Sequence, residues 1–159
     1  MSGPLPRYDI HRPLVMYDWR METVSGFVNV SSRYRMRGIY DSDETKERNE
    51  SFVNDGFRLL NLKSFKIKVY PEDIDAFANF DGSPVEIRFP QTTDVLTIHG
   101  MLDGTVPVYD AVLYAKTLSN RRPRTHSVDL MEHTDHNCNR RHDEVVRTIL
   151  DVGCMEGNG

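Results

Sequence analysis

Two kinds of hydrophobic pattern alternate along the second half of the chain. Residues 94–98 and 126–131 contain short apolar runs that suit strands buried inside a sheet. Residues 108–119 and 142–151 instead carry apolar side chains at the spacing of a helix. Because strand, helix, strand and helix follow one another at short intervals, the pattern predicts βαβ units and a parallel sheet.

Each of the two helices has a predicted buried face. In the first helix this face comprises Val108, Ala111, Val112, Ala115 and Leu118. In the last helix it comprises Val145, Val146, Ile149 and Leu150. Gly153 is placed to terminate the last helix, since glycine commonly follows a helical C-terminus.

The first half of the chain has weaker patterns. A short buried helix is predicted over residues 14–22, and residues 25–31 form a β-rich run that predicts a strand parallel to those above. Residues 41–51 are dominated by charged and amide side chains and fit a solvated helix or a mobile segment. Residues 57–70 predict a hairpin, after which Pro71 begins a helix with Ile74, Phe77 and Ala78 on one face.

Composition narrows the classes of protein that fit. The chain has 159 residues, enough for one domain or part of a larger one, and residues 1–12 resemble a loose arm rather than a secretory signal. The net charge of −4 gives no electrostatic case for nucleic acid or an anionic membrane. No apolar run approaches the roughly 18 residues that a membrane span needs. Two cysteines cannot build a disulfide framework, so we expect a reducing, cytoplasmic location.

Chemistry-bearing residues follow two of the predicted strands. Asp103 comes three residues after Gly100 in the loop that follows residues 94–98, and Pro107 begins the next helix. His136 lies in the polar loop after residues 126–131. Because ligands of parallel α/β sheets bind beyond the carboxyl ends of the strands, both loops are candidates for a functional site.

These two loops resemble those of a known family. The pattern H-G-x-x-D-x-x-V-P, followed by a strand and E-x-x-D-H, is similar to the last two active-site loops of α/β-hydrolases, in the serine-aminopeptidase-like and esterase-like branch. The resemblance extends over most of residues 14–151. It implies an α/β fold that forms the C-terminal part of an α/β-hydrolase domain over residues 13–152, with a cap-like insertion near 41–90 and a tail at 153–159. It also implies that Asp103 is the catalytic acid and His136 the catalytic histidine.

The chain departs from this family at the nucleophile. The family's serine lies in a G-x-S-x-G turn before the helix that residues 14–21 resemble, and the sequence contains no such motif. Residues 8–13 hold no serine, and the family's oxyanion-hole loop is also absent. Acyl transfer without these groups loses most of its chemistry.

Simpler interpretations exist for each residue. Asp103 alone fits an acid favoured by a helix dipole, and His136 alone fits an exposed loop histidine. The spacing of histidines and one cysteine would suit a Zn²⁺ ion but matches no well-defined site, so we expect no metal and no cofactor. The residues of that spacing are His133, His136, Cys138 and His142. Cys138, Ser31 and Ser32 are weaker nucleophile candidates, and His99 and Gly100 are interpreted as loop architecture.

Two hypotheses follow from these patterns. In the first, the chain represents part of a serine hydrolase that acts on a small-molecule carboxylic ester or related acyl compound once the fold is completed. In the second, it is a non-catalytic truncated paralogue or fragment with a binding role. Since earlier strands are missing, the strand at residues 25–31 is expected to leave an exposed edge through which the chain self-associates.

Overall fold

The computed structural model describes residues 25–41, 45–61, 66–82, 85, 87, 89–120, 122 and 125–155. They fall into two compact units, one within Met36–Asp81 and the other within Tyr17–Arg35 and Gly82–Gly159. The predicted helix at residues 14–22 and the predicted arm at residues 1–12 lie outside the described residues. Within those residues, no helix combines the length and the apolar character that a bilayer crossing requires.

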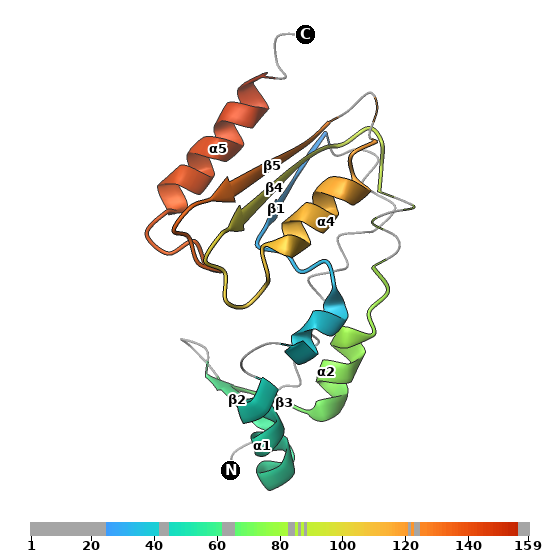
Figure 1. Ribbon diagram of the computed structural model, residues 1–159, viewed down its shortest axis with the longest axis vertical. Helices are drawn as coiled ribbons and strands as arrows, with labels where there is room; N and C mark the ends of the chain where they lie inside the picture. The colour runs from blue at the N-terminus through green and yellow to red at the C-terminus, as the bar shows by residue number, and fades with distance from the viewer. Residues whose placement is uncertain are drawn as a thin grey trace, which may run out of the picture. The chain divides into compact units, whose positions relative to one another are not determined.

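A parallel sheet forms the centre of the second unit (Figure 1). Its strands are β1 (Gly26–Val30), β4 (Asp94–Gly100) and β5 (His126–Met131), with β4 in the middle. In register, Val30 of β1 pairs with Ile98 of β4, which in turn pairs with Asp129 of β5. The predicted parallel arrangement of these three segments is therefore confirmed.

One helix covers each face of the sheet (Figure 1). On one face lies helix α4 (Tyr109–Thr117). Its Tyr114 and the following Leu118 belong to one hydrophobic cluster with Val95 of β4 and Phe89. Helix α5 (His142–Met155) covers the opposite face, where its side chains pack against three buried residues of the sheet. Those side chains are Val145, Ile149 and Val152, and the residues beneath them are Leu96, Ile98 and Met131.

The helical faces differ in detail from the predicted ones. Val112 is 46% exposed, whereas Asp110 and Tyr114 are buried on α4. On α5, Val146 and Leu150 are 53% and 60% exposed. On α4 the buried face is therefore rotated relative to the predicted one. On α5 it is narrower than predicted, because only the side chains at i, i+4 and i+7, here positions 145, 149 and 152, pack against the sheet.

Two further boundaries correct the sequence predictions. Helix α5 continues through Gly153 to Met155, which is possible because glycine inside a helix costs only about 1 kcal/mol relative to alanine. Strand β4 extends through His99 and Gly100, so these residues belong to the strand and not to the loop.

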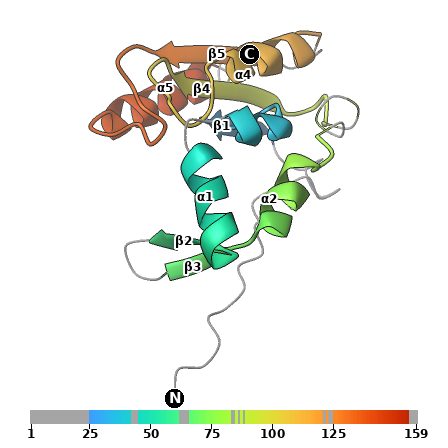
Figure 2. The same ribbon diagram turned by 60° about the horizontal axis from the view of Figure 1, so that its bottom comes forward.

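The first unit contains the remaining elements (Figure 2). A 3-10 helix, η3 (Met36–Asp41), precedes helix α1 (Thr45–Asp55). The predicted hairpin is present as β2 (Arg58–Asn61) paired antiparallel with β3 (Lys66–Val69). Helix α2 (Pro71–Ala78) begins at the predicted proline, and the Asp73 carboxylate accepts a hydrogen bond from the Tyr70 backbone N–H at 2.9 Å.

Candidate active site

Backbone hydrogen bonds join the loop after β4 to the end of β5 and the loop that follows it. Met101 donates its backbone N–H to the Met131 carbonyl at 3.0 Å, and Leu102 donates to the Thr134 carbonyl at 2.9 Å. Gly100 lies where the two loops approach, and a Cβ atom there would overlap backbone atoms of Thr134. From the sequence, Gly100 was expected to serve the architecture of the loop, but the close approach of two backbones is what requires glycine here.

This arrangement turns the Asp103 carboxylate inward. Its Oδ1 atom accepts hydrogen bonds from the backbone N–H groups of Thr105 and Val106, both at 2.8 Å. Its side chain has 0% of its surface exposed. Because Oδ1 is occupied by its own loop, Oδ2 is directed toward residues outside the loop.

His136 meets this second oxygen from the neighbouring strand end. Its Nδ1 atom lies 2.9 Å from Asp103 Oδ2, and 35% of its side-chain surface is exposed. An ionised carboxylate only accepts, so Nδ1 carries the proton in this pair and Nε2 is left with its lone pair. Among the described residues, that Nε2 atom has no hydrogen-bond partner.

A tight turn holds His136 in this position. The Asp135 carboxylate accepts the backbone N–H groups of Asn137 and Asn139 at 3.1 Å and 3.0 Å, and the Asn139 side-chain amide at 2.8 Å. These hydrogen bonds, from Asn139 above all, lower the pKa of Asp135. The turn also places Cys138 at a φ of 52°, a left-handed conformation that is uncommon for any residue except glycine.

The structure thus brings together the two residues that the sequence singled out. They lie on loops after adjacent parallel strands, which is the placement expected from the fold. A half-exposed imidazole backed by a buried carboxylate can accept a proton at Nε2 and later return it.

The other sequence candidates are placed differently. Cys138 is only 3% exposed, and burial raises the pKa of its thiol, as do the negative charges of Asp135 and Asp103 to a smaller extent. A buried thiol with a raised pKa is a poor nucleophile at neutral pH. Ser31 is only 6% exposed at the end of β1.

Within the described part of the chain, no three His, Cys, Asp or Glu side chains converge as metal ligands. The spacing of His133, His136, Cys138 and His142 therefore does not produce a zinc site among those residues. Instead, His142 contacts the Asn137 carbonyl through its Nε2 atom at 3.1 Å.

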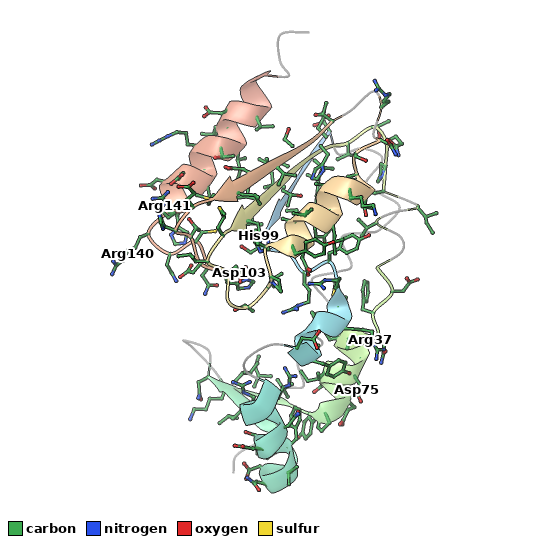
Figure 3. All side chains as sticks on the ribbon, in the orientation of Figure 1. Arg37, Asp75, His99, Asp103, Arg140 and Arg141 are labelled. Carbon is green, nitrogen blue, oxygen red and sulfur yellow. The ribbon has the colours of Figure 1, made fainter. Side chains whose placement is uncertain are left out.

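His99, expected from the sequence to serve loop architecture, lies beside the acid of the site. This residue is fully buried, and its Nε2 atom lies 3.3 Å from Asp103 Oδ2 (Figure 3). Strand alternation could have identified this position. Val95, Thr97 and His99 share one face of β4, and Asp103 lies in the loop that follows this strand.

Two solved structures are similar to this one over about half of their own length. The structure is similar to that of an esterase domain from a Rhodothermus marinus protein, with 12% identity and a TM-score of 0.45, covering 77% of this chain and 47% of the other. It is also similar to a putative hydrolase from Agrobacterium vitis S4, with 18% identity and a TM-score of 0.44, covering 82% and 49%.

The chain's own α/β arrangement consists of the three-stranded parallel sheet with a helix on each face. The chain spans about half the length of these two solved structures. No family model matches the chain, and no curated protein matches it.

Proposed function

We propose that this chain carries the acid and the general base of a serine-hydrolase-type site that acts on carboxylic esters or related acyl bonds. The observation that supports this most directly is the 2.9 Å contact between Asp103 Oδ2 and His136 Nδ1. The contact joins a fully buried carboxylate to a partly exposed imidazole. Both loops also carry the family pattern of the sequence.

The proposed roles follow from this geometry. His136 takes a proton from the nucleophile at Nε2 and then gives it to the leaving group. Asp103 holds the ring with its proton on Nδ1 and stabilises the imidazolium that forms during the reaction. The two backbone hydrogen bonds to Oδ1 keep the carboxylate in place while the ring changes its charge.

The nucleophile and the oxyanion hole are proposed to come from a segment outside these 159 residues. The sequence contains no G-x-S-x-G turn, and the buried Ser31 and Cys138 do not replace it. The isolated chain is therefore expected to lack esterase activity. Its substrate in the completed site is a small ester or acyl compound.

The free edge of β1 is relevant to the behaviour of the isolated chain. Among the described residues, β1 pairs with β4 alone, and Val28 and Val30 are each 39% exposed. An unpaired edge with apolar side chains favours pairing with another chain. We therefore expect concentration-dependent self-association, which sedimentation at several concentrations would detect and which a Val28→Lys substitution would weaken.

Labelling with a fluorophosphonate probe tests the catalytic proposal. The isolated chain and a longer chain, extended by the coding sequence upstream of Met1 and containing G-x-S-x-G, are incubated with the probe and analysed by mass spectrometry. We expect label on the upstream serine of the longer chain and none on the isolated chain. His136→Ala should abolish the label, whereas the exposed His142→Gln, which keeps a side-chain donor, serves as the matched control.

The alternative hypothesis predicts another outcome. A non-catalytic fragment with a binding role would leave the longer chain unlabelled, or its coding sequence would lack the motif. Label on the isolated chain, removed by His136→Ala, would instead identify a nucleophile within these residues and refute the proposal that it lies outside.

A further inference from the structure

His99 lies beside the Asp103 carboxylate, beneath the surface of the site. It is the penultimate residue of β4 and pairs in register with Leu130 of β5. Its side chain is 0% exposed. Figure 3 shows His99 at the strand end, next to Asp103 in the following loop.

The contacts of the His99 ring define its tautomer. Nε2 lies 3.0 Å from the backbone carbonyl oxygen of Val106. A carbonyl only accepts hydrogen bonds, so Nε2 carries the proton and donates it. Among the described residues, the buried Nδ1 atom has no hydrogen-bond partner, so an N–H there would be left without an acceptor.

The same nitrogen also lies close to Asp103. Nε2 lies 3.3 Å from Asp103 Oδ2, the oxygen that receives His136. The partial positive charge of this N–H attracts Oδ2, while the bond to Val106 fixes the end of the loop that supplies the two donors to Oδ1. The carboxylate is therefore held from both sides, through its loop and through Oδ2.

We propose that His99 is a positioning residue that orients the Asp103 carboxylate toward His136. This inference rests on the function proposed above, because the orientation matters only if the pair is catalytic. An apolar residue of similar size at position 99 would leave the Val106 carbonyl without this donor and Oδ2 without one of its two ring contacts. The carboxylate could then rotate away from His136, and His136 would lose its preference for the Nδ1–H form.

Nitrogen-15 NMR of the histidine rings in the full 159-residue chain tests this inference without any activity measurement. In the wild-type chain we expect His99 with its proton on Nε2 and His136 with its proton on Nδ1. His99→Gln keeps a donor near the position of Nε2 and should preserve the His136 pattern. His99→Leu removes the donor and should shift His136 toward the Nε2–H form by several-fold in population.

Thr97→Val is the matched control. Thr97 is also fully buried on β4, and its hydroxyl contacts His126 at 2.9 Å, away from Asp103. This variant should leave the His136 pattern unchanged even if it lowers stability. The inference is overturned if His99→Leu leaves His136 unchanged, or if Thr97→Val shifts it equally.

The wild-type spectrum alone keeps the test decisive if His99→Leu does not fold. A proton on Nδ1 of His99 alone would overturn the inference, because Nε2 could not then donate to Val106 and would place a lone pair, not a positive N–H, near Oδ2. The experiment also separates the two proposals. Fluorophosphonate labelling can fail while the His99 tautomer and the response of His136 remain as expected, and the reverse can also occur.

Discussion

Asp103 and Asp110 are both fully buried carboxylates near the start of α4, yet they have different kinds of partner. Asp110 accepts the backbone N–H groups of Tyr34 and Arg35 at 2.9 Å and 3.2 Å, and the Arg35 Nε–H at 2.9 Å. Asp103 accepts two backbone N–H groups of its own loop and then faces His136.

The partner decides what each carboxylate can do. A guanidinium stays charged at any pH that proteins survive, so the Asp110 cluster can only hold the segment after β1 against α4. An imidazole gains and loses a proton near neutral pH, so the Asp103 cluster can take part in proton transfer. Burial of an acid therefore does not by itself identify a functional site.

The largest expected effect separates the two acids by activity in the longer, nucleophile-bearing chain. Asp103→Asn should lower kcat for ester hydrolysis by about 10⁴-fold, the loss that this type of change causes in a Ser-His-Asp enzyme by favouring the wrong histidine tautomer. Asp110→Asn should lower activity only in proportion to the folded fraction. Initial rates normalised to the folded fraction from circular dichroism make the comparison. Equal losses in the two variants would contradict the separate roles.

The free energy of unfolding should depend more on Asp110 than on Asp103. Asp110→Ala removes three hydrogen bonds and leaves the N–H groups of Tyr34 and Arg35 without acceptors, so it should lower the free energy of unfolding by about 2–4 kcal/mol. Asp103→Asn keeps an oxygen for the loop donors and should cost about 1 kcal/mol. Urea unfolding measures both.

Asp143→Ala is the control for the stability measurement. Asp143 is exposed in the first turn of α5, so its removal should change the free energy of unfolding by less than about 0.5 kcal/mol. If Asp110→Ala were no more destabilising than this control, Asp110 would not hold the segment after β1.

The sequence predicted the Asp103 cluster better than the Asp110 cluster. Asp103 and His136 could be found because both follow buried strands, and the ends of parallel strands meet at one edge of a sheet. Asp110 has the sequence features of an ordinary helix-start acid, since its partners Tyr34 and Arg35 are far away along the chain and follow no periodic pattern.

Other parts of the fold were predictable to the extent that they depend on local pattern. The strand and helix order of the second unit follows from periodicity, and the hairpin and helix α2 follow from alternation and Pro71. The exposure of Val112, Val146 and Leu150 does not, because it depends on how each helix is rotated against the sheet. The same is true of Gly100, whose role depends on a backbone more than 30 positions away.

A smaller effect tests the charged partner of Asp110. Arg35→Lys removes the planar group that reaches Asp110 through Nε and lies 5.4 Å from the centre of the Tyr109 ring. Because 49% of the Arg35 side chain is exposed, the expected loss of stability is only about 1 kcal/mol. Urea unfolding measures it, and Arg147→Lys on the exposed face of α5 is the control. A loss as large as that of Asp110→Ala would mean that the guanidinium, and not the backbone donors, dominates this cluster.

The smallest expected effect uses Cys138 as a reporter of the Asp103 charge. Burial is the main reason that the pKa of Cys138 is raised, and the negative charge of Asp103 adds to the rise, whereas Asp110 is not among its causes. Asp103→Asn should therefore lower the pKa of Cys138 slightly and speed its alkylation by iodoacetamide at pH 8 by about two- to threefold. Asp110→Asn should leave the rate unchanged under conditions where the chain stays folded.

The measurement uses a Cys154→Ser background, so that Cys138 is the only thiol, and follows alkylation by mass spectrometry across pH. The raised pKa of Cys138 also makes the stability of the chain depend on pH. A thiol whose pKa is raised by folding contributes stability that is fully present below its unfolded value, about 8.5, and is lost as the pH rises through the folded value. A Cys138→Ala chain should accordingly lose less stability between pH 8 and pH 10 than the Cys138 chain. Faster alkylation in Asp110→Asn than in Asp103→Asn would show that the thiol does not report on the Asp103 charge, and with it the electrostatic distinction between the two acids would fail.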